Sequence, residues 1–281
     1  MPNVLITGVG TNWKNNSQHT PVATKKELFY RLMLPLVTHA NSMVRTRRER
    51  LREMKAVIAD GGVLDADATL QLVNLSSFLQ VPLGGDESES QILAAIDQLL
   101  YRLDELPAAL VLGQAAYESG YGTSRFAALG NAFFGQWTYG GEGIRPEQQR
   151  TELGDHRIAS FEWPFDSVRG YYINLSTHRA YEPLRKLRAE MREAGKPLDS
   201  MVLADGLISY SERGQEYIDT LKSMITVNRL AAADQAVFRD EPLRFIVGAQ
   251  DEEDATRLRA EIEVLRGNGG LDQILKRMQL E

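Results

Sequence analysis

The chain has 281 residues, of which 43% are hydrophobic and 25% charged, as in an ordinary globular protein. Its formal net charge of -6 argues against a nucleic-acid partner, because such proteins usually present a basic face. The sequence contains no cysteine, which excludes disulfides and thiolate metal sites.

Membrane and export signals are also missing from the sequence. No uninterrupted apolar run approaches the roughly 20 residues that a membrane helix needs, so we expect no membrane span. A basic segment followed by an apolar one, the pattern of a signal peptide, is not visible after Met1. An exported form would therefore need a signal that has been removed, or another route.

Residues 1–23 contain an apolar strand-like piece, Val4–Gly10, followed by a polar stretch. The Gly8-Val9-Gly10 turn suggests a dinucleotide-binding fingerprint. However, Trp13 occupies the place of the third glycine, and polar residues stand where the fingerprint expects a helix. We therefore expect no dinucleotide site. The four histidines have no paired metal-ligand spacing, so no metal or organic cofactor is expected either.

Residues 24–104 form a helical N-terminal region. Apolar periodicity predicts helices at Lys25–Asp60, Ala66–Leu79 and Ser88–Leu103. Pro35 lies inside the first of them and should bend or split it, because proline cannot donate the backbone hydrogen bond that the helix needs.

The next predicted helix carries the most informative residue of the chain, Glu118. An apolar segment follows Pro107 and is terminated by Gly120 and Gly122, so Glu118 falls in the last helical turn. There the carboxylate would lie beside unpaired carbonyls and the negative end of the helix dipole, and aromatic neighbours would desolvate it. A carboxyl kept protonated near neutral pH can act as a general acid. The plain alternative is a surface Glu at a frayed helix end.

The remainder of the chain mixes strands with helices. Residues 138–162 lack a helical period, are punctuated by glycines and end in an alternating strand at Arg157–Phe161, which predicts a small β-lobe. A helix is predicted at Gln215–Val227. In the tail, 231–281, a strand at Leu243–Val247 precedes an acidic-capped helix from Asp251 to Arg266.

The two strands outside the lobe, Val4–Val9 and Leu243–Val247, cannot stand alone, because a lone strand leaves backbone groups unpaired. They must pair with each other, with a partner or with a copy of the same chain. We expect residues 231–281 to be an appendage that docks a protein partner or a second protomer. A tail folded back onto its own monomer is the equally weighted alternative.

Several blocks of the sequence resemble one enzyme family. The run from Glu118 to Phe126 and the run from Gly130 to Trp137 resemble bacterial Bax-type and FlgJ-type glucosaminidases of glycoside hydrolase family 73. The likeness continues through Phe165–Val168, Asn174–Tyr181, Tyr210–Gly214 and Tyr217–Ile218. It implies a mainly α, lysozyme-like helical domain with a small β-lobe. The short C-terminal strand-helix appendage lies outside the resemblance and is predicted from its own residues. The expected domains are 1–23, 24–104, 105–230 (catalytic) and 231–281.

The resemblance also implies a second carboxylate across a cleft from the acid. Glu147 best matches the family's second acidic position, while Glu142 and Glu152 remain alternatives. Each of the three, taken singly, has the plain alternative of a solvated loop charge.

Aromatic residues in the resembling blocks would bind the sugar rings, whose C–H faces pack on Trp and Tyr. These residues are Trp137, Tyr139, Tyr210 and Tyr217. Tyr217 matches a tyrosine that, in family members, reaches toward the acetamido group of the reacting sugar. Its alternative is a core aromatic on the helix Gln215–Val227.

The function implied is an endo-β-N-acetylglucosaminidase that cuts the glycan strands of peptidoglycan, periplasmic or otherwise exported to the cell wall. Glu118 would protonate the leaving oxygen, and either Glu147 or the substrate's own acetamido group would assist the second step. One alternative is a muramidase or lytic transglycosylase of the same fold. The other is a catalytically weak wall-binding scaffold protein.

Overall fold

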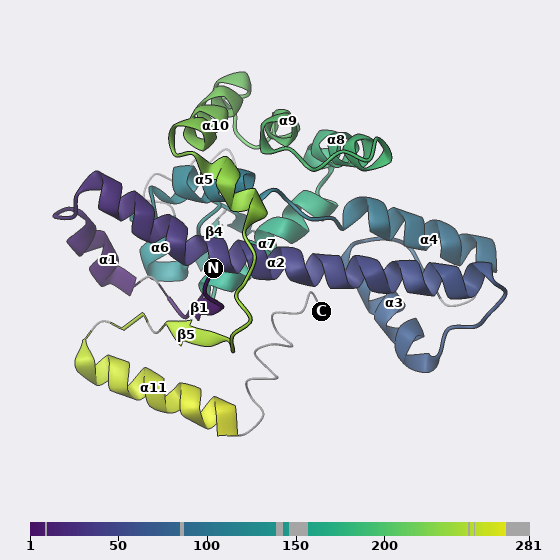
Figure 1. Ribbon diagram of the computed structural model, residues 1–281, viewed down its shortest axis with the longest axis horizontal. Coiled ribbons are helices and arrows are strands. Elements are labelled where there is room, and N and C mark those ends of the chain that lie inside the picture. The colour runs from purple at the N-terminus through teal and green to yellow at the C-terminus, as the bar shows by residue number, and fades with distance from the viewer. Residues whose placement is uncertain are drawn as a thin grey trace. The chain divides into compact units, whose positions relative to one another are not determined.

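The computed structural model describes residues 1–8, 10–84, 87–138, 143–145, 157–246, 248–249 and 251–267. This part of the chain is mainly helical with two small sheets, which confirms the predicted fold class (Figure 1). It divides into two compact units. The first comprises the described residues of 1–38, 108–171 and 220–267, and the second those of 39–107 and 172–219.

The long helix α2, Val22–Ala59, contributes to both units and runs without interruption past Pro35, so the proline does not split it. The other helices that contribute to the first unit are α1 (Gly10–Ser17), α5 (Ala108–Ser119), α6 (Arg125–Gly130), α7 (Pro164–Thr177), α10 (Gln215–Val227), η3 (Leu230–Gln235) and α11 (Glu252–Gly267). The second unit contains α3 (Ala66–Phe78), α4 (Glu89–Arg102), η2 (Arg179–Tyr181), α8 (Glu182–Glu193) and α9 (Ser200–Asp205), together with parts of α7 and α10.

The predicted β-lobe is present as a three-stranded antiparallel sheet. Its strands are β2 (Trp137–Thr138), β3 (Gly143–Ile144) and β4 (Arg157–Ala159), in the order β2-β4-β3. Ile158 in the central strand is buried, so one face of this small sheet packs onto the helices of the first unit.

The two remaining strands pair with each other. β1 (Val4–Ile6) and β5 (Arg244–Ile246) form a parallel ladder in which Leu5 lies opposite Phe245, and Figure 1 shows them side by side. All three β1 side chains are buried. The tail therefore folds back onto its own chain at β5, as the alternative expectation had it.

The polar stretch after β1 is the helix α1, which the sequence did not predict. Its apolar content is low, and its position depends on a tertiary contact: Trp13 Nε1 donates a 3.0 Å hydrogen bond to the Tyr121 carbonyl. The argument that polar residues replace a helix after this glycine turn is therefore wrong; among the described strands, β1 pairs with β5 alone.

Helix α5 is the centre of the first unit. Every residue from Ala108 to Ala116 is buried, as expected for a helix that is apolar on all sides. Gly113 lets α10 approach closely, since a Cβ at this position would lie only 3.0 Å from Leu221 Cδ1. This packing fixes the helix that carries Glu118.

The second unit is held by a cluster of charged residues at the end of α4. Arg188 is 1% exposed and donates to the carbonyl oxygens of Tyr101, Arg102 and Asp104. The Asp104 carboxylate accepts hydrogen bonds from Arg192 at 2.9 and 3.0 Å and forms an ion pair with Arg48 at 3.3 Å. These arginines satisfy the carbonyls that a helix leaves unpaired at its C-terminus.

Candidate active site

Helix α5 ends where the glycines predict, and Glu118 is its penultimate residue with a half-buried side chain. The chain then turns through three consecutive left-handed residues, Gly120 (φ 57°), Tyr121 (φ 60°) and Gly122 (φ 75°). The Tyr121 amide donates back to the Ala116 carbonyl at 3.0 Å, which closes the helix end. The turn thereby fixes the backbone that presents Glu118.

Ser119 ties this turn together from inside the protein. Its fully buried hydroxyl donates to the Ala115 carbonyl at 2.5 Å and accepts from the Gly122 amide at 2.9 Å. Its own carbonyl accepts from the Ser124 amide at 2.9 Å. The expectation that the carbonyls of this last turn are unpaired is therefore wrong for Ala115, Ala116 and Ser119, because the glycine-rich turn supplies their donors.

Tyr121 anchors the same turn on its outer side. Its carbonyl accepts from Trp13, and its ring meets the edges of Phe29 and Tyr30 at centroid distances of 5.7 and 5.9 Å. A non-glycine residue at positive φ is strained by about 1 kcal/mol or more. The aromatic packing and the indole hydrogen bond offset this strain, so the turn is rigid next to Glu118.

The segment that faces Glu118 is the second resembling block. A Cβ built on Gly135 (φ 61°) would lie 3.5 Å from Glu118 Oε2, so the carboxylate lies over this glycine. The preceding residues are fixed by burial: Phe133 donates its amide to Ser167 Oγ at 3.1 Å, and the Phe134 ring stacks on Tyr171 at 4.2 Å. Glu118 and Gly135 are thus brought together by two well-packed elements.

The aromatic residues predicted to bind sugar are distributed over both units. Trp137 opens β2 in the first unit and is 47% exposed. Tyr210 and Tyr217 belong to the second unit, where their rings stack at 5.7 Å with an interplanar angle of 8°. Tyr217 is 1% exposed, the environment of the core aromatic that was its alternative interpretation, whereas Tyr210 is half-buried.

Four of the predicted or alternative site residues lie outside the described residues: Tyr139, Glu142, Glu147 and Glu152. Within the described ranges, no group of three or more His, Asp or Glu side chains is placed to hold a metal ion. No helix in the part of the chain that the structure describes is long and apolar enough to cross a membrane.

Sequence reasoning missed Ser119, Ser167 and Gly135 as residues that position the site. Helix α7, which carries Ser167, begins at Pro164. Asp166 Oδ2 accepts from the Trp163 amide at 3.2 Å, which leaves Ser167 to bind Phe133. The signal available was the glycine in the Phe134–Trp137 block, although its proximity to Glu118 is a tertiary contact.

Comparison with known proteins shows which family this sequence is similar to. Residues 95–230 match the model of the Glucosaminidase family, described as mannosyl-glycoprotein endo-beta-N-acetylglucosaminidase. Protein bax from Escherichia coli (strain K12) is 29% identical over 210 residues, which cover 74% of this chain and 72% of that protein. No solved structure gives a significant match. The matched range contains both Glu118 and Gly135.

Proposed function

We propose that this protein, whose residues 95–230 belong to the Bax-type glucosaminidases, cuts peptidoglycan glycan strands as an endo-β-N-acetylglucosaminidase. The family match supports a glycoside hydrolase that acts on a peptidoglycan-related substrate. The bond cleaved would lie on the reducing side of N-acetylglucosamine. Because its substrate lies outside the cytoplasmic membrane, we propose that the protein acts in the periplasm or the cell wall.

The observation that carries the proposal is the placement of Glu118. The Glu118 side chain is half-buried and stands at the end of a buried helix. Its carboxylate lies over Gly135, which has no side chain that would press against it. The position at the negative end of the helix dipole disfavours the carboxylate anion. Such a group suits proton donation to the leaving oxygen of a glycoside.

The second step requires another group, for which we propose Glu147. Its carboxylate would activate the attacking water. If the substrate's acetamido group assists instead, Tyr217 is the residue proposed to orient it. Gln variants of Glu142, Glu147 and Glu152 decide between the two: equal and small losses for all three would favour the acetamido route.

The test is muropeptide analysis by mass spectrometry after purified sacculi have been incubated with the protein. New reducing ends at N-acetylglucosamine are expected from the native protein. Glu118→Gln should lower their formation by about 10²–10⁴, the usual loss for a missing general acid, because Gln keeps the volume but cannot deliver a proton.

The matched control is Glu193→Gln, which changes an exposed Glu at the end of another helix, α8. This variant should cleave like the native protein. Near-native cleavage by Glu118→Gln would remove Glu118 from the mechanism. Anhydro sugars or reducing N-acetylmuramic acid among the products would instead identify a transglycosylase or a muramidase.

A further inference from the structure

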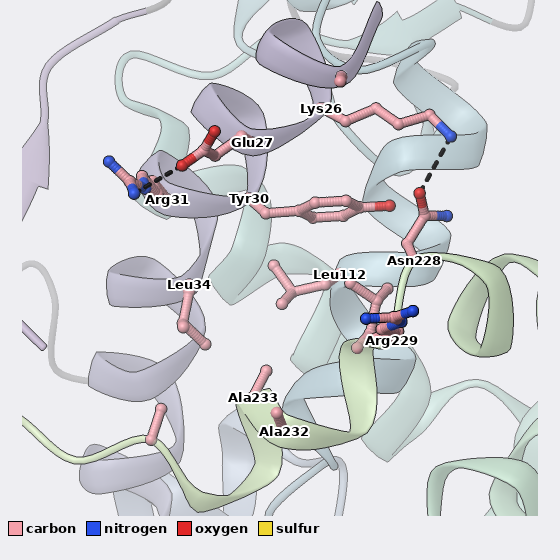
Figure 2. Close-up of a pocket in the computed structure, with 13 residues that line it drawn as sticks. Lys26, Glu27, Tyr30, Arg31, Leu34, Leu112, Asn228, Arg229, Ala232 and Ala233 are labelled. Atoms are coloured by element: carbon pink, nitrogen blue, oxygen red, sulfur yellow. Dashed lines mark hydrogen bonds and ion pairs between the residues drawn. The ribbon is translucent and has the colours of Figure 1, made fainter.

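A cavity of about 550 Å³ lies in the first unit, and Glu118 is not among the residues that line it. It is formed by α2, α5 and the segment that follows α10, and Figure 2 shows side chains from all three converging on it. Its walls are small and apolar, with Leu34 and Leu112 on the helices and Ala232, Ala233 and Ala236 opposite. A cavity of this size and composition suits a small organic ligand.

Positive charge is in excess around the cavity. The only carboxylate among the lining residues, Glu27, is engaged by Arg31 at 2.6 Å. Lys26 Nζ binds a neutral partner, Asn228 Oδ1, at 3.0 Å (Figure 2). The Arg229 guanidinium makes no hydrogen bond or ion pair with the described residues. Lys26 and Arg229 therefore leave two cations without an anion on the cavity rim.

Arg229 also has an unusual backbone. It follows α10 in the left-handed conformation (φ 53°, ψ 41°), at a position where helices most often use glycine. An arginine there adds backbone strain that glycine would avoid. The side chain gained by this choice is the cation on the cavity rim.

Tyr30 also lines the cavity. Its hydroxyl oxygen is buried from solvent and lies beside Tyr121. Figure 2 shows the ring extending from α2 toward Asn228. Burial, and then the neighbouring Tyr121, raise the pKa of Tyr30, so the hydroxyl remains protonated at neutral pH.

We propose that this cavity binds the end of a short peptide that terminates in alanine with a free carboxylate, as stem peptides of peptidoglycan do. The apolar walls would take the alanine methyl group, and Lys26 and Arg229 would bind the carboxylate. The identity of the peptide rests on the proposed function, whereas the carboxylate-binding chemistry rests on the cavity itself.

The cavity and the candidate acid share one helix. Leu112 in the cavity wall and Glu118 lie on the same helix, separated by about 9 Å along its axis. An extended four-residue peptide spans up to about 14 Å. A stem peptide could therefore enter the cavity while the glycan strand that bears it lies at Glu118, which would make the enzyme selective for strands that still carry peptides.

The direct test is calorimetric titration of the full-length protein with a synthetic stem tetrapeptide (L-Ala, D-Glu, meso-diaminopimelate, D-Ala). Arg229→Gly and Lys26→Ala should each weaken binding about five- to tenfold, the effect of one charge-assisted hydrogen bond at a partly hydrated site. Arg229→Gly also removes the left-handed strain, so its melting temperature should not fall, and lost binding cannot be ascribed to unfolding.

The matched control is Lys25→Ala, which removes the neighbouring lysine that does not line the cavity. It should bind the tetrapeptide like the native protein. No measurable binding to the native protein, or equal binding by native protein, Arg229→Gly and Lys26→Ala, would overturn the proposal.

Activity separates this proposal from the proposed function. Arg229→Gly should raise KM on sacculi severalfold and leave cleavage of peptide-free glycan strands, prepared with an amidase, unchanged. An equal effect on both substrates would overturn the peptide site while glycan cleavage stands. Peptide binding by a native protein that cuts neither substrate would support the cavity and refute the glucosaminidase activity.

Discussion

Asp104 and Glu118 each lie at the C-terminal end of a helix, and the two helix ends are stabilised in different ways. Asp104, just after α4, is surrounded by the guanidinium groups of Arg48, Arg188 and Arg192. The turn that holds Glu118 at the end of α5 is built from neutral groups: the hydroxyl of Ser119, backbone amides and the indole of Trp13.

The difference bears on which carboxyl can exchange a proton. Burial alone would raise the pKa of Asp104, but the hydrogen bond from Arg192 and the charges of Arg188 and Arg48 outweigh it, and the pKa is lowered. Asp104 is therefore a permanent anion whose role is structural. At the end of α5, which carries the proposed acid Glu118, hydrogen bonds from neutral groups hold the glycine turn in place.

The largest loss of stability is expected from Asp104→Asn, which disrupts the charged cluster at the end of α4. It leaves the buried Arg188 and Arg48 without their anion, and the free energy of unfolding should fall by about 3–5 kcal/mol. Urea denaturation measures the loss. The control is Asp97→Asn, which removes an exposed ion pair with Lys55 and should change stability by less than about 1 kcal/mol. A similar small change for Asp104→Asn would show that the cluster is not stabilising.

Acid should destabilise the second unit in two stages. Burial lowers the pKa of His39 to about 4, below its ordinary value, so the unfolded chain binds this proton first. Stability is then complete above about pH 6.5 and falls by up to about 3 kcal/mol as the pH drops to 4. Asp104, with its lowered pKa, adds a further loss only below about pH 4. Thermal melts across pH should show both stages, and His39→Gln should remove the first. Melts of this variant that fall as steeply as the native ones between pH 6.5 and 4 would contradict it.

Ser119→Ala tests the turn at the end of α5, which is held by neutral groups. Removal of the buried hydroxyl leaves the Gly122 amide without its acceptor, which should cost about 1–3 kcal/mol. Because this turn presents Glu118, turnover per folded molecule should fall as well, whereas Asp104→Asn should leave it unchanged. Ser77→Ala, an exposed serine on α3, serves as the control for both measurements. Full turnover in Ser119→Ala would show that this turn is not needed to position Glu118.

The smallest expected change in stability comes from glycine substitutions compared in pairs. Gly135→Ala and Gly195→Ala both place a Cβ on a left-handed backbone, with φ of 61° and 64°, and each should destabilise by about 1 kcal/mol. The Cβ at Gly135 meets the Glu118 carboxylate, whereas nothing lies within 4 Å of the one at Gly195. Only Gly135→Ala should lower kcat. Equal kcat values in the two variants would mean that Gly135 does not control the acid.

Local sequence signals placed most helices to within a residue or two. The predicted Ala66–Leu79, Ser88–Leu103 and Gln215–Val227 correspond to α3, α4 and α10, because periodic apolar residues and N-caps are properties of neighbouring residues. At Ser88, for example, the amide donates to Gln91 Oε1 at 2.9 Å in a capping box.

Features that depend on distant contacts were not predictable in this way. Helix α1 is polar, and Trp13 anchors it to a turn more than a hundred residues away. The end of α5 was predicted, but the pairing of its carbonyls and the approach of Gly135 to Glu118 arise only from tertiary packing. The identity of the candidate acid could therefore be inferred from the sequence, while the means by which it is positioned could not.

The parallel pairing of β1 with β5 has a mechanical consequence. The first strand of the chain and a strand near its end are joined side by side, with the Thr7 amide bound to the Ile246 carbonyl and the Arg244 amide to the Asn3 carbonyl. A pulling force applied through the two ends of the chain loads this ladder in shear, so its hydrogen bonds must rupture together and not one after another. Helix α5, which lies between these strands in the sequence, is shielded from tension until that ladder ruptures.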